Sequence, residues 1–378
     1  MKFRLLALAC LIIAAPCLAQ RHKVTIDTGT KEGTLLQEIG EQTDEAQKIA
    51  KLEQFVTAYP KHEGIVLVYE LMVTSYAKAG QPDKAMSAGD QLLALDPEDA
   101  QGAHEVLKAA EAKKDPDAVK KWAVMTSEAA RKVVKSKPKE GEEEEDWKHR
   151  LDFAKQVDVY TEYSLFWMLA QTADPKKKIE LAETLAARNP DSQYLVQVEP
   201  QQFLSYLQTG ENEKAAALAE TAIAKNRASE EMLVALAGHY RAKKETAKAI
   251  EYASKALAAV ESRPKPQDVP EADWEKRKSQ LAGRANFFGG VALFDASKWM
   301  DADKMLRAAL PGIKDDVQMT AEALFSLGVA NYRIGDKGPT ERIKDALVFS
   351  QQCAAIKSRF QAPAQTNIRA IRSQYRIR

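Results

Sequence analysis

Apolar residues recur every three or four positions along most of this chain, and that spacing places them on one face of an α-helix. Two clear runs are Leu67, Leu71, Thr74, Ala77 and Ala249, Ala253, Ala256, Val260. Alanine, leucine, lysine and glutamate dominate the composition, β-branched residues are sparse, and glycine and proline fall mostly between the helical stretches. The pattern therefore predicts an all-α chain.

The window from Val66 to Asp99 predicts a helix hairpin. Gly80 ends the first helix, because glycine adopts a backbone conformation that side chains resist. Pro82 and Asp83 suit the start of the second helix, where a missing N–H and a carboxylate are both tolerated. Ala85 is small, as expected where two helices cross closely, and Pro97 ends the unit.

Similar windows follow, and several such windows are stronger evidence for a repeated hairpin than one would be. Residues 196–229 and 230–263 show the same offsets, although Lys244 stands where a turn glycine is expected. Residues 272–335 fit moderately, and residues 100–190 fit weakly, with longer predicted helices at Pro116 to Val134 and Glu144 to Thr172. In addition, residues 44–60 and 174–190 share Asp, Lys-Ile, Glu and a final Pro at an offset of 130, which indicates two equivalent second helices.

These windows resemble the tetratricopeptide repeat at most of its signature positions. The resemblance implies a right-handed α-solenoid of antiparallel helix pairs over residues 41–360, in which each hairpin buries its apolar faces against its neighbours. Residues 20–40 are then expected to form a partly ordered lead-in, and residues 361–378 a basic C-terminal helix or tail whose arginines suit a helix C-terminus. The segment 140–146, with its acidic run, is expected to belong to a mobile loop that leads into a helix.

Residues 1–19 read as a secretory signal. Lys2 and Arg4 precede an apolar run from Leu5 to Ala15, and a small-x-small site predicts cleavage after Ala19. A membrane anchor would need about 20 apolar residues, and lipidation of Cys17 is disfavoured by Pro16 before it. We therefore expect a periplasmic or secreted protein without a transmembrane segment in its mature chain.

The mature chain would carry 53 Lys and Arg against 54 Asp and Glu, so no overall field favours nucleic acid or a charged membrane. Cys353 would be its one remaining cysteine, which rules out an internal disulfide and is best interpreted as a small buried side chain.

Motifs for chemistry are missing from the sequence. It contains no HExxH, GxSxG, phosphate loop or dinucleotide fingerprint, and its five histidines are scattered without a cysteine or carboxylate at metal-ligand spacing. We expect no metal, no cofactor and no catalytic residues, and hence a protein that is not an enzyme.

The resemblance implies a concave groove lined by the first helices of successive hairpins. Carried onto this chain, the groove positions of the last two repeats hold five aromatics and two arginines, residue types that often anchor peptides. We predict a partner-binding site at these residues, of which at least half of the aromatics are expected to serve the core instead: Arg284, Phe287, Phe288, Phe294, Phe325, Tyr332 and Arg333.

The lysines and asparagines with which chaperone-binding relatives hold a terminal carboxylate are replaced, by residues that include Leu67, Thr74 and Gly238. A chaperone-type partner is therefore not supported.

Two functions remain open. The first is a non-enzymatic protein–protein interaction scaffold of the cell envelope that binds a peptide or helix of a partner protein. The alternative is a carbohydrate-binding accessory or enzyme that uses the atypical middle, residues 100–172, where Trp122, Trp147 and Trp167 could stack on sugars. Exposed, coplanar tryptophans would favour the alternative.

Overall fold

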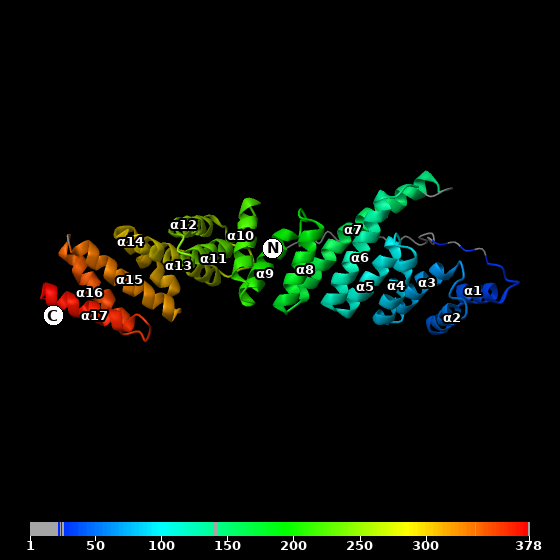
Figure 1. Ribbon diagram of the computed structural model, residues 1–378, viewed down its shortest axis with the longest axis horizontal. Helices are drawn as coiled ribbons and strands as arrows, with labels where there is room; N and C mark the ends of the chain where they lie inside the picture. The colour runs from blue at the N-terminus through cyan, green and yellow to red at the C-terminus, as the bar shows by residue number, and fades with distance from the viewer. Residues whose placement is uncertain (1–21, 23, 25, 139–141, 337, 377–378) are drawn as a thin grey trace. The chain divides into compact units, whose positions relative to one another are not determined.

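The computed structural model describes residues 22, 24, 26–138, 142–336 and 338–376. These residues form helices and no strand, and successive helices along the chain pack as hairpins. The all-α prediction and its consecutive packed helix pairs are confirmed (Figure 1). The expected signal at 1–19 lies outside the described residues. None of the helices described is long and apolar enough to cross a membrane.

The chain divides into two compact units, residues 1–198 and 199–378. The helices of the first unit are α1 (Lys31–Glu41), α2 (Glu45–Ala58), α3 (Ile65–Lys78), α4 (Pro82–Leu95), α5 (Ala100–Lys113), α6 (Pro116–Lys135), α7 (Glu144–Gln171) and α8 (Pro175–Arg188). Helix α9 (Leu195–Gln208) contains the boundary.

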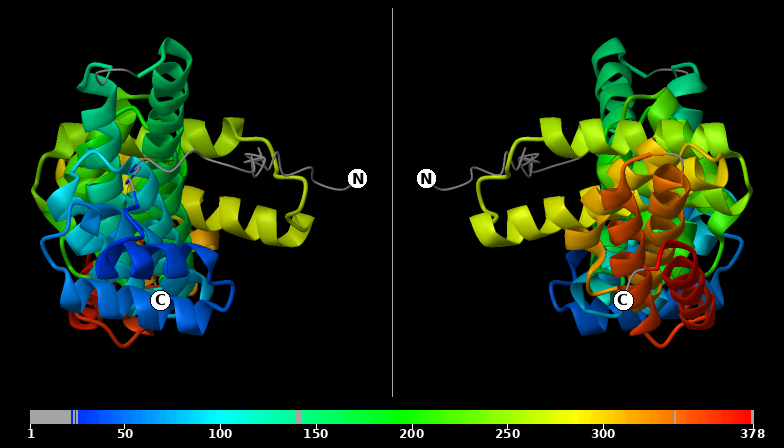
Figure 2. Two further views of the ribbon diagram at one scale, coloured as in Figure 1. Left: turned by 90° about the vertical axis from the view of Figure 1, so that its right-hand side faces the viewer. Right: turned by 90° about the vertical axis from the view of Figure 1, so that its left-hand side faces the viewer.

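The helices of the second unit that follow α9 are α10 (Asn212–Ala224), α11 (Glu230–Ala242), α12 (Thr246–Ser262), α13 (Glu271–Asp295), α14 (Trp299–Ile313), α15 (Val317–Gly335), α16 (Thr340–Ala354) and α17 (Gln361–Tyr375). Figure 2 shows the end of the long α12–α13 hairpin extending beyond the neighbouring helices of this unit. We call the odd-numbered helices the first helices, because each of them before α17, the last helix described, opens a hairpin.

Aspartate side chains start many of these helices. In each case the carboxylate accepts a hydrogen bond from a backbone N–H of the first turn, which has no partner within the helix. The residues concerned are Asp44, Asp99, Asp115, Asp174 and Asp316.

Hairpin turns repeatedly use one residue in the left-handed conformation. Gly80 and Gly210 have φ of 65° and 78°, as expected for glycine. Lys114 and Lys244 adopt φ of 57° and 61° at the equivalent places, so a lysine closes the turn in those hairpins. The α5–α6 hairpin is therefore a regular repeat, although its sequence resembles the family only weakly.

The lead-in is more ordered than we expected. Residues 31–41 form α1, which is capped by the Thr30 side chain and buries Leu35, Leu36 and Ile39. The stack of helices therefore begins about ten residues earlier than predicted. At the other end, α17 forms where the basic helix was expected.

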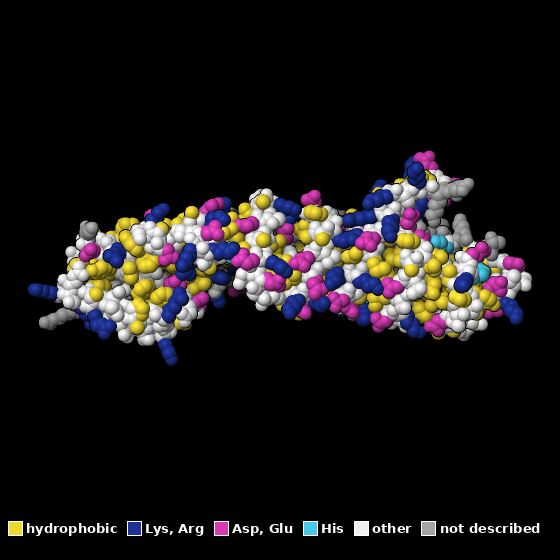
Figure 3. All heavy atoms as spheres, viewed as in Figure 1, with side chains coloured by type: hydrophobic (Ala, Val, Ile, Leu, Met, Phe, Trp, Pro, Cys, Tyr) yellow, Lys and Arg dark blue, Asp and Glu magenta, His cyan; other side chains and the backbone are white. Residues whose placement is uncertain are grey.

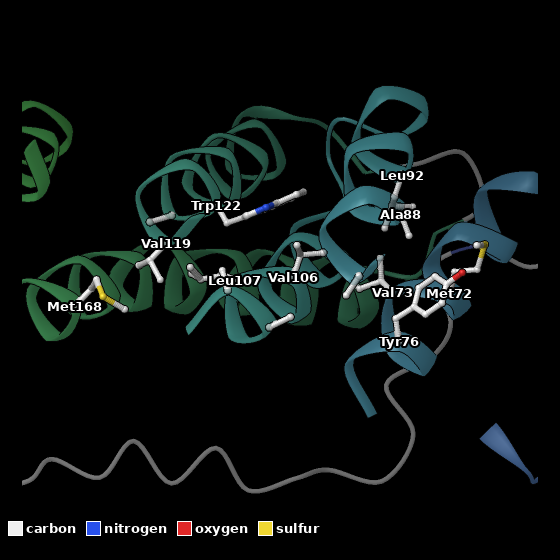
Figure 4. Close-up of a cluster of buried hydrophobic side chains, with 14 of the residues drawn as sticks. Met72, Val73, Tyr76, Ala88, Leu92, Val106, Leu107, Val119, Trp122 and Met168 are labelled. Carbon is white, nitrogen blue, oxygen red and sulfur yellow. The ribbon is translucent and has the colours of Figure 1, made fainter. Parts of the chain in front are cut away.

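The main core cluster of the first unit runs through α1 to α9, and a smaller cluster lies between α5, α6 and α7. Trp122 is the largest fully buried side chain of the main cluster and lies among its other buried side chains (Figure 4). A Cβ added at Gly89 would come within 2.8 Å of the Trp122 ring. Cys353 in α16 is also buried, as predicted, and its Sγ donates to the carbonyl of Ala321 at 3.3 Å. Burial raises the pKa of this thiol to about 11.

Candidate functional site

The first helices α11, α13, α15 and α17 pack in sequence, α11 on α13, α13 on α15 and α15 on α17. The predicted site residues come from α13 and α15. Figure 3 shows hydrophobic side chains gathering over α13 and α15, with Lys and Arg side chains among them. The structure thus places the seven residues on neighbouring elements.

Phe287 does not belong to this surface. Its side chain is 1% exposed and lies in the core of the second unit, below the Arg241 guanidinium, whose carbon is 5.4 Å from the ring centroid. The neighbouring Phe288 crowds Gly238 of α11, where an added Cβ would come within 2.9 Å of its ring. Because Gly238 lets α11 and α13 approach closely, Phe287 is covered, and its assignment to the site was wrong.

The other four aromatics are half-buried. Phe288 packs edge-on against Phe287, and Phe294 packs edge-on against Trp299. Phe325 stacks on Phe360, with ring centroids 5.3 Å apart, and the Tyr332 hydroxyl donates to Gln374 at 2.6 Å. Each ring is fixed by a neighbour and keeps part of its surface in solvent, so these aromatics are rigid and accessible.

The two predicted arginines, Arg284 and Arg333, are exposed, and neither forms an ion pair within the described part of the chain. Near them, Arg241 of α11 approaches the Glu322 carboxylate at 2.5 Å, and Arg359 approaches the same oxygen at 3.6 Å. Arg359 also lies over Phe360, 4.7 Å from its ring centroid. Two guanidinium groups therefore share one carboxylate beside the half-buried rings.

The first unit has an aromatic surface that our sequence reasoning missed. Tyr160, Tyr163 and Phe166 of α7 and Tyr194 form a continuous row with ring centroids 5.2 to 6.1 Å apart. The Tyr160 hydroxyl donates to Glu111 at 2.8 Å, and burial, followed by that carboxylate, raises the pKa of Tyr160. The three-residue spacing within α7 was the available signal, since it places these rings near one helix face.

The ring of His104 is buried beneath this row. It contacts Tyr160 edge-on with ring centroids 4.8 Å apart, and only 3% of the residue is exposed. Its Nε2 atom has no hydrogen-bond partner among the residues that the structure describes. Burial, with a smaller contribution from the charge of Lys108, lowers the pKa of His104 to about 4, so the ring is neutral at pH 7.

One group of potential metal ligands also escaped the sequence search. His22, Glu70 and Asp99 each place a ligand atom within 4.8 Å of the others, although they are widely separated in the sequence. Protein contacts already use this group, because His22 pairs with Asp96 at 3.1 Å and Asp99 accepts from the Gly102 N–H at 2.8 Å. We assign it a structural role, which is to hold the segment before α1 against α3 and α5.

The three tryptophans of the middle region do not form an exposed row. Trp122 is fully buried. Trp147 is half-buried under Arg150, at 4.5 Å from its ring centroid, and Trp167 is half-buried against the core of the first unit. The exposed, coplanar tryptophans that would have favoured carbohydrate binding are therefore not found at these three residues.

Comparisons with known proteins address the class of the chain. Residues 201–265 match the family model described as tetratricopeptide repeat. This match covers α10, α11 and α12, and the same hairpin recurs in both units with left-handed turn residues at equivalent places. Residues 201–265 of the chain are therefore similar to the tetratricopeptide repeat. A comparison with curated proteins found no match.

Solved structures show a lower likeness to this chain. The APC/C hetero-tetramer Cut9-Hcn1 is 13% identical, with a TM-score of 0.34 over 91% of this chain and 56% of that chain. This chain thus spans little more than half of that structure's length. The P58(IPK) TPR domain is 14% identical (TM-score 0.30; 92% and 100% covered), and yeast Tom70 is 11% identical (TM-score 0.23; 93% and 98% covered). Likenesses of this size carry no argument about partners.

Tetratricopeptide repeat proteins are in general scaffolds for protein–protein interaction and are generally not catalytic. The match over residues 201–265 therefore supports an interaction scaffold as the coarse class.

Proposed function

We propose that this chain is an interaction scaffold of the cell envelope that binds a peptide or helix of a partner protein on the first-helix face of the second unit. The binding residues in this proposal are Arg284, Phe288, Phe294, Phe325, Tyr332 and Arg333. The observation that carries it is the combination of half-exposed, fixed aromatic rings with exposed arginines on α13 and α15. Aromatic and arginine side chains dominate the binding energy of many protein interfaces.

Position-specific photo-crosslinking in the native host tests the binding surface. A photoreactive amino acid replaces Arg284 or Arg333 on the proposed face, and Lys304 or Lys314 as controls. Both lysines are exposed residues at α14, which is a second helix. We expect one partner to be captured from positions 284 and 333 only. Capture of the same protein from all four positions, or from none, would remove the proposed surface.

The envelope location rests on residues 1–19 and has its own test. N-terminal sequencing of the protein recovered from the native host is expected to begin at Gln20, in the periplasmic or secreted fraction. A cytoplasmic product that retains residues 1–19 would contradict export and leave the binding surface unaffected.

A further inference from the structure

We infer that the partner segment bound by the first-helix face of the second unit is acidic, an inference that rests on the proposed function. Its starting point is the distribution of charge between the units. Residues 199–378 contain 28 Lys and Arg against 22 Asp and Glu, whereas residues 1–198 contain 27 against 32. The near-neutral balance of the whole chain therefore conceals a cationic second unit.

The arginines without carboxylate partners are not spread evenly over the second unit. Most of its arginines are paired, for example Arg227 with Glu199 at 2.6 Å, Arg277 with Glu231 at 2.5 Å and Arg342 with Asp303 at 2.7 Å. Among the described residues of this unit, the arginines without an ion pair are Arg284, Arg333, Arg369, Arg372 and Arg376. All five belong to α13, α15 and α17 or directly follow α17, so they lie on the series of first helices.

The arginines of α17 form one stripe. Arg369 and Arg372 are three residues apart, which places them near one face of the helix, and Arg376 directly follows the helix in the left-handed conformation; all three are exposed. The opposite face buries Ala364 and Ile371. Residues 357–378 contain six Lys and Arg and no Asp or Glu, so nothing within this segment neutralises the stripe.

Positive charge is also in excess between α11, α15 and the segment before α17. Arg241 and Arg359 share the Glu322 carboxylate, whose side chain is 15% exposed, so one guanidinium there lacks a full counter-charge. Asp295, at the end of α13, is an exposed carboxylate on the same helix as Arg284, and its single charge does not balance Arg284 and Arg333 together. A guanidinium binds a carboxylate with two parallel hydrogen bonds, so Asp or Glu side chains of a partner fit these positions.

The half-exposed rings of Phe288, Phe294 and Phe325 lie on the same helices as these cations. The occupant that matches both features is a protein segment that carries apolar side chains together with Asp or Glu. Complementary charge of this kind speeds association and selects against basic competitors.

Fluorescence anisotropy with the full chain tests the inference. The probes are two labelled 20-residue peptides with the same Leu and Phe positions, one with Glu and the other with Lys at the remaining positions. We expect the Glu peptide to bind at least tenfold more tightly, and 0.5 M NaCl to weaken it strongly because salt screens exposed charges. Equal binding of both peptides, or tighter binding of the Lys peptide, would overturn the inference.

Matched variants assign the effect to this face. R284E/R333E is expected to weaken binding of the Glu peptide at least tenfold. K304E/K314E makes the same change in net charge on a second helix, and its affinity for the Glu peptide should stay within threefold of the wild-type value. Equal weakening by both variants would show that net charge alone is responsible. A dT20 oligonucleotide that displaces the Glu peptide from the wild-type chain at equal concentration would also overturn the inference, because it lacks apolar side chains. Capture of a basic partner segment by photo-crosslinking at Arg284 would keep the proposed function and remove the acidic partner.

Discussion

Helices α3–α6 and α9–α12 are two versions of one arrangement. Each helix of the later set begins 130 residues after its counterpart, at Ile65 and Leu195, Pro82 and Asn212, Ala100 and Glu230, and Pro116 and Thr246. The left-handed turn residues agree as well, with Gly80 matching Gly210 and Lys114 matching Lys244. The offset first seen between residues 44–60 and 174–190 thus extends over four more helices. The backbone plan is kept while the side chains that fill it differ.

The difference is clearest in how the crossings are filled. In the first set, Trp122 is fully buried over Gly89. The equivalent positions in the second set are Tyr252 and Ala219, and Tyr252 is half-buried and stacks on Tyr240 with ring centroids 5.4 Å apart. His104, likewise, corresponds to Val234. One arrangement of helices therefore accepts two packing solutions, provided that large and small residues are exchanged together.

The largest expected effect comes from removing the aromatic ring at this crossing. Trp122→Ala should destabilise the first unit by about 3–5 kcal/mol, because a fully buried large side chain leaves a cavity. Tyr252→Ala should cost the second unit about 1–2 kcal/mol, since part of its ring is already in solvent. Urea unfolding of both variants measures the difference, and equal costs would contradict the contrast in burial.

A pH-dependent difference is expected at His104. Its pKa is about 4 in the folded chain and about 6.5 when unfolded, so between these values the unfolded chain binds the proton and stability falls as pH falls. The loss from pH 7 to pH 4.5 should be about 2.5 kcal/mol.

His104→Val, which installs the residue of the second set, should remove this contribution from the first unit. Urea unfolding at the two pH values measures it, with Val234→Ala as a control that alters packing and adds no titrating group. An unchanged pH dependence in His104→Val would show that His104 does not titrate as described.

Substitutions at both Gly89 and Trp122 test whether the two residues share the same packing space. Gly89→Ala alone should cost about 2 kcal/mol, because its Cβ would lie 2.5 Å from Val106 and 2.8 Å from the Trp122 ring. Adding Trp122→Tyr should make the double variant less destabilised than the sum of the single ones. A double-mutant cycle from urea unfolding gives the coupling, and strict additivity would mean that the two sites do not share this space.

The smallest expected effect concerns the turns. Gly80→Ala should cost about 1 kcal/mol through backbone strain alone, because no atom lies within 4 Å of the added Cβ. Lys244→Gly relieves the same strain and should be neutral or stabilising by less than about 1 kcal/mol. In thermal unfolding, Gly80→Ala should lower the melting temperature, whereas Lys244→Gly should leave it unchanged or raise it. Destabilisation by Lys244→Gly would mean that the Lys244 side chain contributes contacts.

The fold could be predicted because the residues that define a hairpin lie close together in the sequence. Tyr76, Gly80 and Ala85 each perform a backbone or packing role that their own residue type requires. The α5–α6 hairpin was harder to recognise, since Lys114 replaces the glycine whose conformation it adopts. Helix α1 was missed because it is only eleven residues long and buries only three large apolar side chains.

The candidate site was only partly predictable. The repeat register placed Arg284 and Arg333 on the surface, and the structure agrees. It could not indicate that Gly238 brings α11 against α13 and so buries Phe287. The sharing of Glu322 by Arg241 and Arg359 depends on side-chain directions in elements far apart in the sequence, which a pattern of residue types does not contain.

The burial of Cys353 also offers an experimental advantage. In a chain that starts at Gln20, this thiol is the one cysteine, and its raised pKa and its hydrogen bond to Ala321 suppress its reaction with maleimide dyes. A cysteine introduced at Arg284 would then be the single reactive thiol of the folded protein. One fluorophore could be attached there without any background substitution, and its emission would report directly when a ligand covers that face.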